Sequence, residues 1–226
     1  MNTFFFGLYP YVAVAVCFFV GWARFDRDQY TWKTGSSQML ANNGMRLASN
    51  LFHVGVLFIL MGHVVGLLTP EAIYHHFIST QAKQLLAMIS GGFFGIVCLV
   101  GLVMLVRRRM EDPRVRATST TSDIVVLFLL LAQLILGLLT VLISTQHLDG
   151  SVMVMLANWA QYIVTFQMDK AVASIEGVNI IYKLHVFLGL TLILIAPFTR
   201  LVHVVSAPIW YLMRPYQIVR KKSAQA

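Results

Sequence analysis

The sequence predicts an all-α membrane protein, a bundle of five transmembrane helices. Of its 226 residues, 58% are hydrophobic and only 12% are charged, and the apolar residues are gathered into five long runs. The mean hydropathy of +0.74 is far above that of a soluble domain of this length. A bilayer core about 30 Å thick takes roughly 20 apolar residues per helix, so each run is long enough to cross.

The first expected helix covers residues 4–21. It has no basic start and no small-residue cleavage site, and Arg24 and Arg27 follow its apolar run, so we interpret it as a retained helix and not a signal peptide. No repeat or soluble segment interrupts the chain, which is expected to form one membrane domain over residues 1–226. The other expected helices cover residues 47–68, 85–106, 124–143 and 178–205.

Two connections between these helices are long, at residues 26–46 and 144–176. We expect both to be loops, on opposite sides of the membrane, and loops of this length often carry function. Within the fifth helix, Pro197 removes a backbone donor, so a kink or an unwound turn is expected there.

Basic residues are unevenly divided between the two sides of the predicted bundle. Of the 17 Lys and Arg residues, only Lys83, Lys170 and Lys183 fall on the side where the chain begins. By the positive-inside rule the other side is cytoplasmic, so we expect an external N-terminus and a cytoplasmic C-terminus. The net charge of +8 is therefore explained by topology, with contacts to lipid headgroups or a cytoplasmic partner, and does not indicate nucleic-acid binding.

Four of the seven histidines fall inside predicted helices, His53 and His63 on the second and His185 and His203 on the fifth. Ionisable side chains in lipid are costly and mark functional sites by default. Because these two helices run antiparallel, His53 should lie at the depth of His203, and His63 at the depth of His185. Two facing imidazole pairs are what two bis-histidine haems require, which favours haem ligation over hydrogen bonds between helices.

The spacing of these histidines differs between the two helices. Ten residues separate His53 from His63, about 15 Å of helix, whereas eighteen residues separate His185 from His203, about 27 Å. Helix tilt, an oblique haem or a break at Pro197 could each absorb the difference. Glycines lie within four residues of the histidines, and they either admit a planar ligand or serve ordinary helix packing: Gly55, Gly62, Gly66 and Gly189.

The remaining reactive side chains add less. Cys17 and Cys98 form no CxxCH motif, so any haem is held without covalent bonds. Asp123 begins a helix and is expected to cap it. With almost no other carboxylate in the spans, a proton relay is the weaker interpretation of the buried histidines. Three histidines fall in external loops, where contact with water is expected: His75, His76 and His147.

Several segments carry a family resemblance: FFFGLYPYVA near the start, RFDRDQYTWKTGSSQML after it, LASNLFHVGVLFILMGHVVGLLTP (47–70), RRMEDPRVRATSTTSDI (108–124) and KLHVFLGLTLILIAPFTRLVHVVSAP (183–208). They closely resemble the gamma subunit of the membrane-bound respiratory nitrate reductase, over nearly the whole chain. The resemblance implies a five-helix cytochrome b of the bacterial inner membrane with two haem b groups. It makes His53 and His203 the axial ligands of the haem nearer the cytoplasm, and His63 and His185 those of the haem nearer the periplasm.

The same resemblance implies a function in anaerobic respiration. Membrane quinol, either menaquinol or ubiquinol, is oxidised near the periplasmic haem and its protons are released there. The electrons cross to an iron–sulfur beta subunit and then to a molybdenum alpha subunit that reduces nitrate to nitrite. With only two cysteines, this chain has no ligand set for those other centres.

Three further site residues follow from the resemblance. Lys83, at the external end of the third helix, is the candidate for the quinol pocket, and Gly62 beside His63 is expected to leave room in it. Arg109, and with less support Arg108, is expected to pair with haem propionates. Without the resemblance, Lys83 would be interpreted first as an interface anchor, and the arginines as ordinary cytoplasmic anchors.

Two other functions fit part of the pattern. One is the cytochrome b subunit of a different quinone-linked complex built on the same scaffold. The other is a haem-free membrane anchor or small transporter in which the histidines hold helices together. A transporter is expected to have paired broken helices or pseudo-symmetric halves, and the sequence has neither. Haem content separates the first class from the second.

Overall fold

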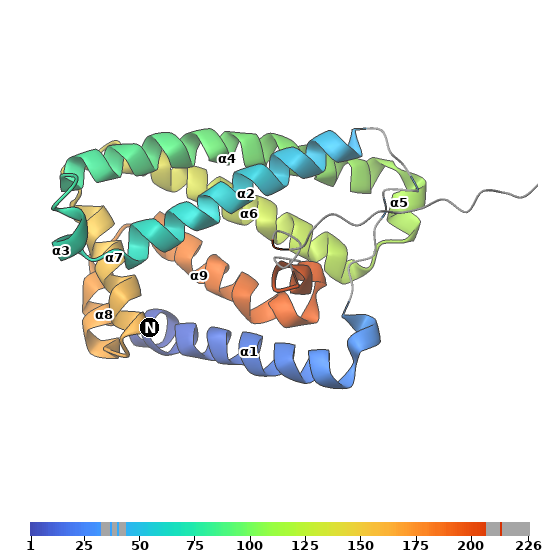
Figure 1. Cartoon of the computed structure of the whole chain (residues 1–226), viewed down its shortest axis with the longest axis horizontal. Coiled ribbons are helices and arrows are strands. Elements are labelled where there is room, and N and C mark those ends of the chain that lie inside the picture. Colours follow the sequence, from blue (N-terminus) through green and yellow to red (C-terminus); the bar gives the residue numbers. More distant parts are fainter. Residues whose placement is uncertain (33–36, 38–39, 41–43, 207–212, 214–226) are drawn as a thin grey trace, which may run out of the picture.

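The computed structural model of the chain describes residues 1–32, 37, 40, 44–206 and 213. Among these residues, five helices are long and apolar enough to cross a membrane, which confirms the predicted all-helical fold (Figure 1). Lys33 and the basic residues from 214 onward, which the charge argument used, lie outside the described residues. The first span, Thr3–Arg27, consists of the π-helical η1 (Thr3–Leu8) and α1 (Tyr9–Arg27). The next three spans are single helices, α2 (Met45–Leu68), α4 (Thr80–Glu111) and α6 (Thr121–Ser144). The fifth span, Ile180–Phe198, consists of α9 (Ile180–Ile195) and η3 (Ala196–Phe198).

The connections gather at two ends of the bundle (Figure 1). The α7 end holds the N-terminus together with α3 (Glu71–Tyr74), α7 (Ser151–Val164) and α8 (Met168–Glu176). The α5 end holds η2 (Gln29–Thr31) and α5 (Pro113–Ala117), whereas η4 (Arg200–Val204) lies inside the bundle, in the half nearer α5. Successive spans therefore run in opposite directions, as the count of crossings predicts.

Two spans extend by more than four residues beyond their predicted apolar runs. The first was expected over residues 4–21 and continues to Arg27, and the third was expected over 85–106 and covers Thr80–Glu111. Hydropathy marks only the part of a helix that fits the hydrocarbon, whereas polar turns extend it at both ends. In α4 the Ser79 side chain accepts the N–H of Ala82 at the start, at 3.2 Å, and an Arg107–Glu111 pair at 2.9 Å stabilises the last turn.

The prediction that residues 144–176 form a loop is wrong, because this stretch contains α7 and α8. At 14 residues α7 is too short to cross a bilayer, so a search for spans does not find it. It buries Trp159 and Ala160 in a core cluster with Ile175 of α8 and Phe6 of η1. The Trp159 indole N–H donates to the Phe6 carbonyl at 2.9 Å, so these helices fix the beginning of the chain.

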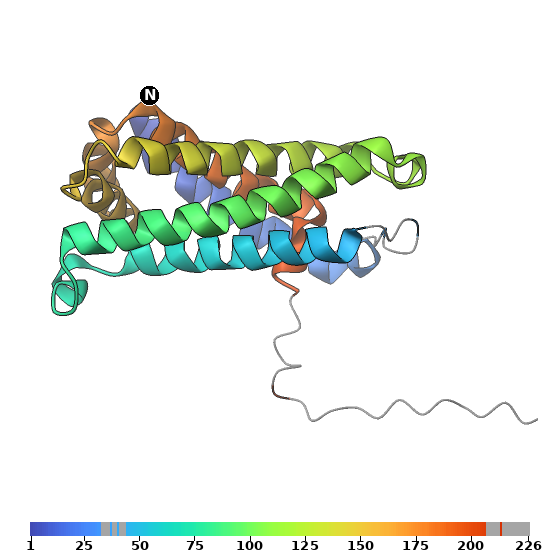
Figure 2. The same cartoon turned by 90° about the horizontal axis from the view of Figure 1, so that it is seen from above.

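The spans pack as a series of neighbours, α2 on α4, α4 on α6, α6 on α9 and α9 on α1 (Figure 2). The contact between α2 and α4 is close because glycine stands on both sides of it. A Cβ at Gly55 would lie 2.6–2.7 Å from Cys98, and one at Gly101 would lie 2.4 Å from the Phe52 nitrogen. In contrast, α2 and α9 make almost no backbone contact with each other. The two helices that carry the histidines are therefore held apart by their neighbours.

The fifth span is not the continuous helix expected over 178–205. The helix α9 ends at Ile195, a 3-10 turn follows over Ala196–Phe198, and Thr199 is extended (φ −127°, ψ −179°) before η4 begins. The break surrounds Pro197, as predicted, because proline cannot donate to the preceding turn.

Candidate functional site

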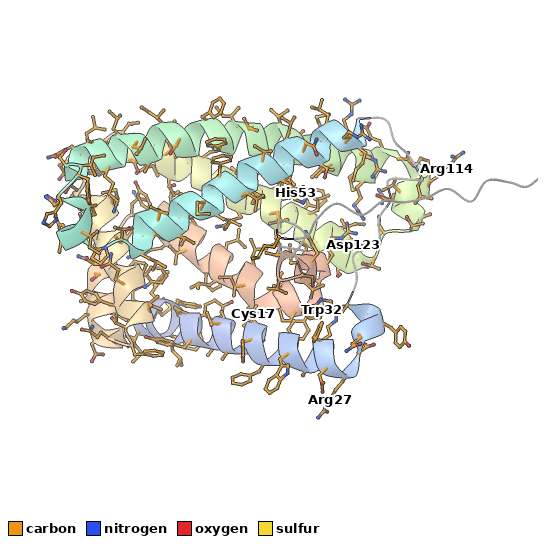
Figure 3. The ribbon with its side chains drawn as sticks, viewed as in Figure 1. Cys17, Arg27, Trp32, His53, Arg114 and Asp123 are labelled. Atoms are coloured by element: carbon orange, nitrogen blue, oxygen red, sulfur yellow. The ribbon has the colours of Figure 1, made fainter. Side chains whose placement is uncertain are left out.

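Four histidines form two facing pairs, two from α2, one from α9 and one from η4. His63 and His185 lie toward the α7 end, with ring centres 6.0 Å apart. His53 and His203 lie toward the α5 end, with ring centres 6.4 Å apart, and Figure 3 shows His53 on the inner side of α2. These are the pairs that the antiparallel argument predicts. The unequal sequence spacing is accommodated because the chain leaves the α9 axis after Ile195.

The separation within each pair fits one metal atom between the rings. A metal binds an imidazole nitrogen at about 2.0–2.1 Å and that nitrogen lies ~1.1 Å from its ring centre, so opposed ligands have ring centres about 6.3 Å apart. Two rings joined directly by a hydrogen bond would have centres only about 5 Å apart. The observed ring-centre distances of 6.0 and 6.4 Å are close to the first value and longer than the second.

Backbone carbonyls orient three of the four rings. Nδ1 of His53 lies 2.7 Å from the Ser49 oxygen, Nδ1 of His63 lies 2.8 Å from the Ile59 oxygen, and Nδ1 of His203 lies 2.6 Å from the Arg200 oxygen. A carbonyl only accepts, so each Nδ1 carries the proton and each Nε2 keeps its lone pair. Metal-binding histidines are held in this tautomer by the same kind of hydrogen bond.

His185 has a different environment, supplied by α6. Its Nδ1 is buried without a hydrogen-bond partner among the described residues. The Gln133 amide donates to the His185 carbonyl at 3.1 Å and lies 3.5 Å from Nε2, while Gly137 lies against the ring. Gln133 was not predicted as a site residue, although a lone amide inside an apolar span is a signal of one.

The donor set suits a haem better than a bare ion. In the part of the chain that the structure describes, no group of three or more His, Cys, Asp or Glu side chains could hold a metal. Each pair offers two ligands, one from α2 and one from α9 or the segment that follows it. A haem iron has four in-plane nitrogens already and needs only two axial ligands, so the residues present fit this group.

Comparison with known proteins places the whole chain in one family. The sequence pattern described as nitrate reductase gamma subunit matches residues 2–222. The chain is 50% identical over 222 residues to the respiratory nitrate reductase 1 gamma chain of Escherichia coli K12, covering 98% of each. It is 36% identical over 220 residues to the nitrate reductase gamma chain of Bacillus subtilis 168, covering 96% of this chain and 97% of that one.

The chain belongs to the nitrate reductase gamma subunit family. A gamma chain is one part of a multi-subunit oxidoreductase, so this gamma subunit has partner subunits. Membership and five membrane-length helices together make it a multi-pass membrane protein.

In this gamma subunit Lys83 lies at the α7 end, near the start of α4. Its ammonium lies 3.7 Å from the ring centre of Tyr74, a favourable cation–π contact. The nitrogen is buried and has no hydrogen-bond partner among the described residues. Since a buried ammonium without an acceptor is costly, this atom is suited to a ligand oxygen.

The glycines near the histidines serve different purposes. Gly55 is a packing residue of the α2–α4 contact. Gly189 lies against the side chain of Gln133, since a Cβ at position 189 would be 3.1 Å from the amide nitrogen of Gln133. A Cβ at Gly62 or Gly66 would meet nothing within 4 Å. Protein packing therefore explains Gly55, whereas the surroundings of Gly62 and Gly66 have space for a larger group.

A half-buried charge network lies toward the α5 end. Asp123 takes part in the predicted cap of α6, as the third helical residue of a capping box whose N-cap is Thr120, and it also pairs with two arginines. Its carboxylate lies 3.1 Å from Nε of Arg200 and 3.7 Å from Nη1 of Arg109, and Arg109 donates to the Ser119 hydroxyl at 2.7 Å. Arg108 instead donates to the hydroxyl and carbonyl of Ser37. The role of Asp123 as an ion-pair partner was not predicted.

Proposed function

We propose that this gamma subunit is the quinol-oxidising di-haem cytochrome b of a respiratory nitrate reductase. The observation that carries the proposal is the pair of facing histidine couples, 6.0 and 6.4 Å apart, at two depths of one helical bundle. Bound in these couples, two haem b groups would supply one-electron carriers in series across the membrane. The protein contributes the four imidazoles and their orientation.

The proposed orientation puts the α5 end in the cytoplasm of a bacterial inner membrane. Lys83, Lys170 and Lys183 are the basic residues of the α7 end, whereas the α5 end carries a larger set: Arg24, Arg27, Arg46, Arg107, Arg108, Arg109, Arg114, Arg116 and Arg200. In Figure 3 Arg27 and Arg114 point away from the bundle, where headgroups or a partner can contact them. His63 and His185 then lie nearer the periplasm.

Quinol is proposed to bind near the periplasmic couple, with Lys83 as its polar contact. The ammonium would donate a hydrogen bond to a quinol oxygen and favour the deprotonated hydroxyl, because a cation stabilises a nearby oxyanion. Gly62 would leave space for the quinone ring. Oxidation of one quinol releases two protons, which leave on the periplasmic side, and two electrons.

The electron acceptor is proposed to be an iron–sulfur beta subunit docked on the basic cytoplasmic face, followed by a molybdenum alpha subunit where nitrate is reduced. The relatives include the gamma chains of two respiratory nitrate reductases of Escherichia coli, which supports this assembly. Arg109 is proposed to add a charge-assisted contact to a haem propionate beside His53 and His203. Its partners Ser119 and Asp123 would hold the guanidinium in place.

The test is a dithionite-minus-oxidised spectrum with pyridine haemochrome quantitation on the purified complex. Two b haems per gamma chain are expected, and quinol addition should reduce them. A folded complex without haem would refute the proposal and return the histidines to helix packing. One haem per chain would refute the two-couple arrangement while keeping the electron-transfer class.

A further inference from the structure

His203 differs from the other three histidines because no α-helix presents it. The helix α9 ends at Ile195, and His203 follows a 3-10 turn, the extended Thr199 and the short η4. Backbone hydrogen bonds of a continuous helix fix the direction of His53, His63 and His185. The position of His203 must therefore be set by contacts that the segment 196–206 makes with other elements.

Among the described residues, at least three side chains from other elements contact this segment. Arg24 of α1 donates to the Pro197 carbonyl, and the Trp32 indole N–H donates to the Ser206 hydroxyl. The third is Asp123 at the start of α6, whose carboxylate lies 3.1 Å from Nε of Arg200. Figure 3 places the labelled His53 and Asp123 in the half of the bundle that ends at α5.

The Asp123 contact is the one that leads directly to the histidine. Arg200 presents its side chain to Asp123 and its own carbonyl to Nδ1–H of His203, at 2.6 Å. One residue thus joins the carboxylate to the imidazole. The pair is sheltered, with Arg200 25% and Asp123 15% exposed, so it is screened less by water and salt than a surface pair.

We propose that Asp123 is a positioning residue for His203: through Arg200 it fixes the segment beyond the end of α9 that turns this imidazole toward His53. The part of this inference that concerns the haem rests on the proposed function, whereas the contacts from Asp123 through Arg200 to His203 do not depend on it. It assigns to Asp123 a role beyond its helix cap, and it explains why a carboxylate stands in a region otherwise rich in arginine.

The variants separate this role from the cap. The Thr120 N–H donates to the Asp123 carboxylate at 3.1 Å. Asp123→Asn keeps a side-chain oxygen that can accept this hydrogen bond, but it removes the charge that faces Arg200. Thr120→Ala removes the other half of the capping box and leaves the carboxylate, so it is the matched control. Arg200→Gln breaks the same pair from the other side, and Arg200→Lys keeps the charge.

The first readout is hydrogen exchange of the amides of residues 200–206 in the assembled complex, which needs no haem. Asp123→Asn and Arg200→Gln should both accelerate exchange in this segment, and Thr120→Ala should not.

The second readout is the midpoint potential and the low-spin EPR signal of each haem, assigned with His53→Ala and His63→Ala complexes. Only the haem assigned to His53 and His203 should change its potential and EPR signal. The change should be smaller in Arg200→Lys than in Arg200→Gln. The double variant Asp123→Asn with Arg200→Gln should show no larger change than either single variant.

Three results would overturn the proposal. The first is unchanged exchange and EPR signals in Asp123→Asn. The second is a shift in Asp123→Asn that Arg200→Gln does not reproduce, since the effect would then pass through Arg109. The third is equal disturbance of both haems, or failure of both variants to assemble, which would make the pair a general folding element. Absence of haem from the unaltered complex would refute the proposed function, while the exchange readout would still decide this inference.

Discussion

Gly137 on α6 lies directly against the ring of His185 on α9: a Cβ at position 137 would stand 3.0 Å from Cε1 of that imidazole. Such a contact is tighter than ordinary packing, so the ring and its neighbour on α6 are matched in shape. The relationship makes position 137 a sensitive probe of the couple that His185 forms with His63.

Gly137→Ala is therefore expected to displace the His185 ring by a few tenths of an ångström. The potential and EPR signal of the haem at this couple should change. The yield of folded protein should fall little, because alanine favours the helical conformation more than glycine does. Gly91→Ala, whose Cβ would meet nothing within 4 Å, is the control. Identical haem signals in both variants would mean that the ring position does not matter to the bound group.

Alanine substitution of the ligands should remove the haems separately. His63→Ala or His185→Ala is expected to remove the haem at the α7 end and stop quinol oxidation. His53→Ala or His203→Ala should leave that haem in place, reducible by quinol, but cut onward transfer to nitrate. Haemochrome quantitation with quinol-reduction spectra checks this, and loss of both haems in each variant would contradict independent couples.

Lys83→Gln should weaken quinol oxidation without changing haem content. Loss of a hydrogen bond from a charged donor costs about 1.5–3 kcal/mol, or roughly 10- to 100-fold in kcat/KM. Lys170→Gln is the matched control, because Lys170 also lies over a tyrosine ring, that of Tyr162 at 5.7 Å, but has a hydrogen-bond acceptor in Gln167. Equal kinetics for both variants, measured with a soluble quinol analogue, would remove Lys83 from the pocket.

Gly101→Ala should destabilise the bundle, because its Cβ would lie 2.4 Å from a backbone nitrogen of α2 and 2.8 Å from the Ala48 oxygen. Backbone cannot move aside as a flexible side chain can, so a loss of about 1–3 kcal/mol or more is expected. Thermal unfolding in detergent, compared with Gly91→Ala, measures it. A melting temperature equal to that of the control would show that α2 and α4 can separate without cost.

Much of the architecture was predictable because hydropathy is a local property. Runs of apolar residues fixed the number of spans, counting the crossings fixed which histidines face each other, and Pro197 marked the break in the fifth span. Boundaries were less accurate, since the polar turns at the ends of α4 are held by caps and ion pairs and not by hydropathy. The short helices α7 and α8 were missed because they do not cross the membrane.

The sequence by itself determined the membrane bundle, the pairing of His53 with His203 and of His63 with His185, and the cap at Asp123. The tertiary structure alone decided that Gln133 and Gly137 adjoin His185, that Gly55 serves packing, and that Asp123 pairs with Arg200. These contacts join residues such as 133 with 185 and 123 with 200, so they depend on how each helix is rotated and where it lies against its neighbours. A periodic pattern within one helix carries no information about that rotation relative to another helix, and only packing sets it.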